Sequence, residues 1–96
     1  MVDREHIAER QCWHCDWCGL PLGDTYAIHH RKLRKHGGDN QPVNLLAVHH
    51  SCHNLGTHSI HLNPKEAYRR GFLVKSWDTP ENAPLIAIDG TTINLA

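Results

Sequence analysis

The sequence lacks the features that would place this protein in or across a membrane. Apolar residues make up 40% of its 96 positions, yet no apolar run approaches the roughly 20 residues that a membrane-spanning helix needs. The segment 1–11 is rich in charged residues and has no apolar stretch of the kind found in signal peptides. We therefore expect no membrane association and a cytoplasmic location.

An excess of positive charge is also missing. The formal net charge is zero with neutral histidines, so the electrostatic footprint of a passive nucleic-acid binder is absent from the chain as a whole. The chain is also short, and a domain of this size buries a smaller fraction of its surface than a larger one does. Any nucleic-acid surface must therefore be a local cluster of charge, and the fold needs an additional stabilising element.

Cysteine and histidine provide candidates for that element. In a reducing cytoplasm the four cysteines are better explained as metal ligands than as disulfide partners. Ten residues are histidine, and eight of these fall between His29 and His61. This composition indicates metal binding, with zinc as the first candidate.

Two short motifs predict a closed zinc site. A C-x-x-C motif and an H-x-x-C motif are formed by Cys15 and Cys18 and by His49 and Cys52. A tetrahedral Cys₃His set leaves no open position, so we expect it to hold structure and to couple folding to zinc binding. Cys12 forms an overlapping C-x-x-C, but the later pair is followed by Gly19, which lets its turn tighten. The alternative is that the cysteines are buried small hydrophobes.

The fold class expected from these patterns is α+β, in three parts. A helical lead-in at 1–11 precedes a metal-organised domain at 12–77, and a hairpin extension follows at 78–96. Within the central part the sequence predicts a strand at Thr25–His30, a strand at Leu45–Val48 and a short helix at His49–Leu55.

Two further elements are predicted from local signals. Asn63 as N-cap, Pro64 at the first helical position and Glu66 as a capping-box residue predict a helix, which Gly71 ends. The pair Asp89-Gly90 lies between two β-prone runs and predicts a hairpin.

A cluster of histidines has the composition of a hydrolytic site. His29 and His30 end a predicted strand and should point to opposite faces, so one can bind a metal while the other faces a substrate. Hydrolysis of a phosphodiester needs a deprotonated water and a cation that stabilises the developing charge. His53 and His61 can approach the same point if the chain between them folds back. Asn44 could bond the backbone or ring of His30.

These residues resemble the His-Asn-His pattern of HNH endonucleases, the His-Me finger or ββα-metal nucleases. The matching segments are His29-His30, Asn44 within Asn-Leu-Leu-Ala-Val, and Cys52-His53. The cysteine pairs resemble the zinc-containing branch of the family. Segments such as His29-His30-Arg31-Lys32-Leu33-Arg34 and Gly37-Gly38-Asp39-Asn40 are most similar to small HNH proteins of bacteriophages that infect actinobacteria. The resemblance covers about Cys15 to Trp77.

The resemblance implies a ββα-metal fold and a role for each matched residue. His30 is expected to be the general base and Asn44 its orienting partner, while His29 and His53 hold a catalytic divalent metal. The position one helical turn beyond His53 is Thr57, where the family often has a histidine. We therefore take His61 as the third ligand, with His58 as its competitor.

This sequence departs from the family pattern at one zinc ligand. His49 stands where a cysteine is more usual, which leaves zinc binding intact. Imidazole ligation of the catalytic cation suits Zn²⁺, Ni²⁺, Co²⁺ or Mn²⁺, and the scarcity of carboxylates argues against Mg²⁺ as the preferred ion.

A cationic segment follows the predicted base and suggests how a substrate binds. Four positive charges lie in five residues: Arg31, Lys32, Arg34 and Lys35. Phosphate contacts of this kind position a duplex without reading its sequence. We expect double-stranded DNA as partner, in the cytoplasm of a host cell if the protein is phage-encoded. Arg69 and Arg70 either extend this track or complement a helix dipole.

Two other functions fit the same residues. One is a non-catalytic zinc module that docks on DNA or protein through Arg31 to Lys35. The other is a nuclease accessory that is active only with a larger partner, such as a phage DNA-packaging complex.

Overall fold

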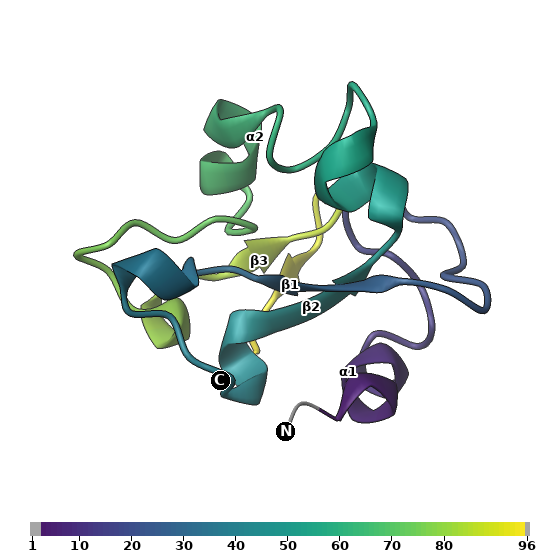
Figure 1. The fold of residues 1–96 in the computed structure, drawn as a ribbon, viewed down its shortest axis with the longest axis horizontal. Coiled ribbons are helices and arrows are strands. Elements are labelled where there is room, and N and C mark those ends of the chain that lie inside the picture. Colours follow the sequence, from purple (N-terminus) through teal and green to yellow (C-terminus); the bar gives the residue numbers. More distant parts are fainter. Residues whose placement is uncertain (1–2, 96) are drawn as a thin grey trace.

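Two small antiparallel sheets and two short helices make up an α+β fold in the computed structural model, which describes residues 3–95 (Figure 1). The helices are α1 (Arg4–Arg10) and α2 (Pro64–Arg69), and the strands are β1 (Ala27–His30), β2 (Leu45–Val48), β3 (Leu85–Ile86) and β4 (Thr92–Ile93). Short helical turns connect them: η1 (Arg34–His36), η2 (Pro42–Asn44), η3 (Ser51–Leu55) and η4 (Pro80–Asn82).

The sheet of β1 and β2 runs through the centre of the molecule. The strands pair antiparallel, with Ala27 opposite Val48 and His30 opposite Leu45. All four residues of β2 are buried, whereas β1 alternates between buried and half-buried positions. His29 is fully buried in the core, whereas His30 is half-buried and bonds Asn40, as side chains on opposite faces of a strand should. The prediction that these two neighbours face opposite ways is therefore confirmed.

Helix α1 packs against β2. The side chain of Asp3 caps it by accepting from the backbone N–H of His6, and Ile7 is buried. Just after the helix, the amide of Gln11 donates to the carbonyl of Ala47 at 2.8 Å and accepts from its N–H at 2.7 Å. The predicted lead-in at 1–11 is thus a helix from Arg4 onward; residues 1 and 2 lie outside the described part.

Helix α2 begins and ends where the sequence predicts, but its N-terminus is held differently. Pro64 opens it and Gly71, with φ of +77°, follows its last turn. The capping box is wrong, because the Asn63 amide donates to the carbonyls of Thr57 and Ser59, and Glu66 forms an ion pair with Arg69. Asn63 therefore fastens the preceding loop instead of capping the helix.

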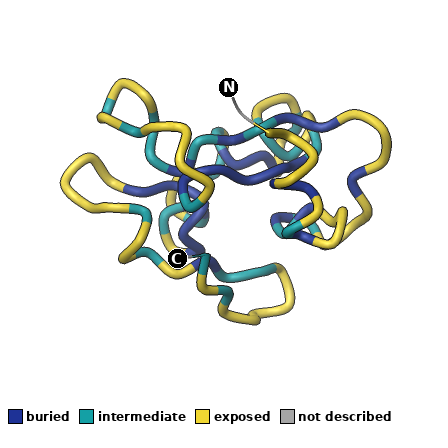
Figure 2. The backbone as a smooth tube through the Cα atoms, turned by 90° about the horizontal axis from the view of Figure 1, so that it is seen from below, coloured by how far each residue is buried: buried dark blue, intermediate teal, exposed yellow. Residues whose placement is uncertain are grey.

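The predicted hairpin is confirmed as β3 and β4, joined through Asp89-Gly90. Its Leu85 is fully buried in the core that β1, β2 and Phe72 share. Buried segments run through the middle of the molecule and exposed loops form its rim (Figure 2). Within residues 3–95, no helix is long and apolar enough to cross a membrane.

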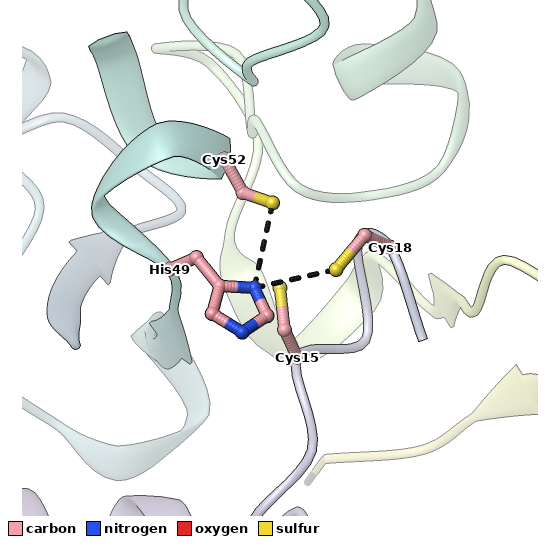
Figure 3. A group of neighbouring side chains, drawn as sticks. All are labelled: Cys15, Cys18, His49 and Cys52. Carbon is pink, nitrogen blue, oxygen red and sulfur yellow. Dashed lines mark hydrogen bonds between the residues drawn. The ribbon is translucent and has the colours of Figure 1, made fainter. Parts of the chain in front are cut away.

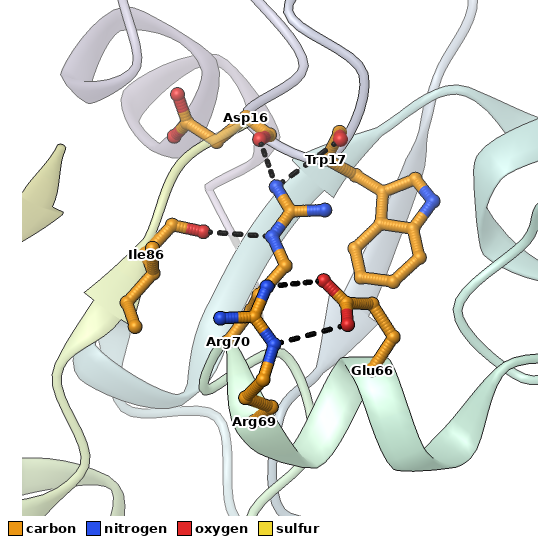
Figure 4. Close-up of polar contacts among 6 residues, drawn as sticks. All are labelled: Asp16, Trp17, Glu66, Arg69, Arg70 and Ile86. Carbon is orange, nitrogen blue, oxygen red and sulfur yellow. Dashed lines mark hydrogen bonds and ion pairs between the residues drawn. The ribbon is translucent and has the colours of Figure 1, made fainter. Parts of the chain in front are cut away.

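A buried arginine ties the hairpin to the Cys15–Cys18 turn. The Arg70 guanidinium donates to the carbonyls of Ile86 at 3.0 Å and Asp16 at 2.9 Å, and it stacks over the Trp17 ring, 4.5 Å from its centroid (Figure 4). Only 4% of the residue is exposed. Arg70 therefore does not extend a DNA track, while its neighbour Arg69 lies at the surface, paired with Glu66.

Candidate metal centres and catalytic histidine

Three cysteines and one histidine come together as the two motifs predict. The ligand atoms of Cys15, Cys18, His49 and Cys52 all lie within 4.8 Å of one another (Figure 3). The Nδ1 atom of His49 is 3.3 Å from the Cys18 sulfur and 3.7 Å from the Cys52 sulfur. This cluster has the donor set of a closed tetrahedral zinc site and could hold such an ion.

The surroundings of the cluster prepare its ligands. The His49 ring donates from Nε2 to the Pro21 carbonyl at 2.7 Å, which leaves Nδ1 with the lone pair that faces the sulfurs. Burial raises the pKa of the Cys15 and Cys52 thiols, so both carry protons in the metal-free protein. Metal binding would release those protons. Cys12 is exposed and lies outside the cluster, so the later C-x-x-C is the correct one.

A second group joins three histidines from distant parts of the sequence. The ligand nitrogens of His29, His53 and His61 also lie within 4.8 Å of one another, in an arrangement that could hold a metal ion. The Nε2 atoms of His53 and His61 are 3.3 Å apart. His61 reaches this point because residues 60 and 61 fold back and donate to the carbonyls of Cys52 and His53. His58 is exposed and is not a member of the group.

The three rings are held in the neutral state that a metal ligand needs. Burial lowers the pKa of His29 to about 3 and also lowers the pKa values of His53 and His61. His29 donates from Nε2 to the Phe72 carbonyl at 2.5 Å, and its Nδ1 is buried without a hydrogen-bond partner. An unpaired buried lone pair is costly. A cation held by His29, His53 and His61, called the trio below, would satisfy this lone pair. The three residues therefore fit a bound metal.

His30 lies on the other side of β1 from the trio and has a partner that the sequence reasoning missed. Its Nε2 donates to the side-chain oxygen of Asn40 at 2.8 Å. The bond leaves Nδ1 as the ring nitrogen with a free lone pair. Asn40 belongs to the Gly37–Asn40 loop, and no sequence spacing indicates that this loop returns to the end of β1.

Asn44 acts on the backbone and makes no bond to His30. Its Oδ1 accepts from the Lys32 N–H at 2.7 Å, and its Nδ2 donates to the carbonyls of Lys32 and Asp39 at 3.2 and 2.8 Å. The expected bond to the ring or backbone of His30 is therefore a wrong prediction. Asn44 instead clamps both ends of the loop that carries Asn40.

One of the four predicted phosphate contacts is wrong. Arg31, the residue after β1, is fully buried and lies two positions beyond the equally buried His29. Its guanidinium donates to the carbonyls of Gly71 at 2.8 Å, Val43 at 2.9 Å and Pro80 at 3.3 Å, and to that of Ala83. Burial lowers its pKa to about 10, so it remains a cation that holds loops together.

The other three cations lie at the surface. The Lys32 ammonium donates to the backbone oxygen of Asp78 at 2.8 Å, while Arg34 and Lys35 are exposed on η1.

Comparison with known proteins gives no match for this chain among family models, curated proteins or solved structures. A functional assignment therefore depends on the geometry of its own residues.

Proposed function

We propose that the protein is a metal-dependent endonuclease of the HNH type that hydrolyses phosphodiester bonds in DNA. One observation carries the proposal: two adjacent histidines of β1 have different partners. His29 joins His53 and His61 in a group that could hold a cation, and His30 presents a ring whose Nε2 is already bonded. In this proposal β1, β2 and η3 form the ββα-metal motif.

The proposed chemistry divides between these two histidines. His30 accepts a proton at Nδ1 from a water molecule, whose oxygen then attacks the phosphorus. The bond from phosphorus to the 3′ oxygen breaks, and that oxygen takes a proton from solvent, which leaves a 5′-phosphate and a 3′-hydroxyl. A divalent cation held by His29, His53 and His61 would stabilise charge on the phosphate and on the leaving oxygen.

The Cys₃His cluster supports the same site from a neighbouring position. Cys52 of this cluster and His53 of the trio are consecutive residues of η3. Zinc bound at the cluster would fix η3 to the Cys15–Cys18 turn and hold His53 beside β1. We assign this ion a structural role because four protein ligands close its coordination shell.

The assay for this function uses zinc-loaded protein whose trio has been freed of metal by mild chelation. Supercoiled plasmid is incubated with Mg²⁺, Mn²⁺, Co²⁺, Ni²⁺ or added Zn²⁺, and with chelator alone. We expect nicked or linear DNA only with an added ion, and product ends that accept a label from a kinase only after phosphatase treatment. Absence of cleavage with every ion by a folded protein would overturn the assignment and favour a docking module or a partner-dependent accessory.

A further inference from the structure

An exposed aromatic and basic surface lies beside the segment that follows His30. The side chain of Trp77 is 75% exposed. The ammonium of Lys75 lies 5.2 Å from the centroid of the Trp77 ring and 5.4 Å from that of the Tyr68 ring. The Lys75 ammonium thus lies over an indole that is largely exposed to solvent.

Two contacts fix this surface next to η1. The N–H of Val74 donates to the carbonyl of Arg31 at 2.8 Å, so residues 74 and 32 pair in parallel. Farther along, the Lys32 ammonium donates to the backbone oxygen of Asp78. The loop at 75–78 and η1 accordingly lie at the same end of the molecule (Figure 1). Lys75 and Trp77 therefore belong to a segment that is bonded to residues 31 and 32, just before η1 with its Arg34 and Lys35.

Within residues 3–95, no ion pair involves the three cations of this surface, Lys75, Arg34 and Lys35. An exposed indole among cations fits a nucleic-acid strand, because phosphates meet the cations while the aromatic face takes a base. In a duplex the base faces are covered by their neighbours, whereas a single strand leaves them free to stack.

We propose that Trp77 stacks on an unpaired base of single-stranded DNA, with Lys75, Arg34 and Lys35 on the flanking phosphates. This inference rests on the proposed function, because it names the substrate as DNA with a single-stranded segment next to the cleaved bond. It concerns binding alone, so it is testable in protein that holds only its structural zinc.

The test measures tryptophan fluorescence of the zinc-loaded protein, without a second metal ion, during titration with an oligothymidylate. Wild type, Trp77→Leu and the control Trp13→Phe are compared; Trp13 is 43% exposed but packs edge-on against Tyr26. We expect saturable quenching in wild type and in the control. Trp77→Leu should lose the quenching and bind about tenfold more weakly or worse. Lys75→Met should reduce the salt dependence of binding by roughly 0.7 in log–log slope.

Three results would overturn the inference: no binding by wild type, equal affinity of Trp77→Leu and wild type, or a blunt duplex that binds and quenches as well as the single strand. None of them depends on cleavage. A protein that binds the oligothymidylate through Trp77 but cuts nothing would refute the nuclease assignment alone, and one that cuts without using Trp77 would refute the stacking alone.

Discussion

The ring of His30 and the side chain of Asn40 are joined by a hydrogen bond of 2.8 Å, from Nε2–H to Oδ1. This contact selects one tautomer and directs the other nitrogen, Nδ1, as the proton acceptor. Asn44 supports this contact indirectly, because it binds the backbone of Lys32 and Asp39 at the two ends of the loop that carries Asn40. Asn40 is therefore a positioning residue for the proposed base.

Replacing Asn40 with leucine should lower kcat about tenfold and leave KM unchanged, because the base loses its orientation while DNA contacts remain. Asn40→Asp should retain activity, since a carboxylate oxygen also accepts from Nε2–H. Nitrogen NMR of the His30 ring should show the Nε2–H tautomer in wild type and a mixture in Asn40→Leu. Gln41→Leu, on the same loop, is the control; an identical ring signal in wild type and Asn40→Leu would contradict the positioning role.

The arrangement of His29, His53 and His61 predicts which histidine would complete the proposed second metal site. His61→Ala should abolish binding of the second divalent ion, whereas His58→Ala should leave it intact, because only His61 lies with His29 and His53. Burial lowers the pKa of each trio member below 6.5. Protons therefore compete for these nitrogens only below the usual histidine range, and binding should persist to a lower pH than it would with three exposed histidines. Calorimetric titration with Co²⁺ measures both; a loss of binding in His58→Ala would reverse the assignment.

The structural cluster predicts a contrast between two cysteines. Cys52→Ser should remove one tightly bound zinc per chain and strongly lower the unfolding temperature, because metal binding and folding are coupled at such sites. Cys12→Ser should change neither quantity, since Cys12 is exposed and outside the cluster. Metal analysis by mass spectrometry together with thermal unfolding by circular dichroism gives both numbers. Zinc loss in Cys12→Ser would show that the overlapping motif supplies a ligand.

The sequence predicted the elements whose signals are local. Alternation and β-prone composition located the two central strands, Asp89-Gly90 marked the hairpin, and ligand spacing gave the Cys₃His set. What it missed depends on contacts between distant segments. The partner of His30 is Asn40, a residue of a loop that folds back. The carbonyls of Gly71 and Ala83, which accept from the buried Arg31, come from segments far along the chain. A run of positive charge in the sequence does not reveal which members point inward.

The buried position of Arg31 can be tested through protein stability. Arg31→Met should destabilise the protein by at least about 3 kcal/mol, because it leaves several buried carbonyls without their charged donor. Lys35→Ala should leave stability within about 0.5 kcal/mol of wild type, as expected at an exposed site, and should weaken DNA binding. Urea unfolding monitored by fluorescence distinguishes the two variants. An Arg31→Met protein as stable as wild type would contradict the structural role of this arginine.

The most direct test of the central claim compares wild type, His30→Ala and His36→Ala on supercoiled plasmid with the activating ion. Each protein is first shown to be folded and to hold its zinc. The proposed mechanism predicts that His30→Ala loses at least about a hundredfold in single-turnover cleavage rate, in line with the contribution of a general base. His36→Ala, altered in the neighbouring η1, should cut like wild type. Equal cleavage by wild type and folded His30→Ala would contradict the assignment of His30 as the base.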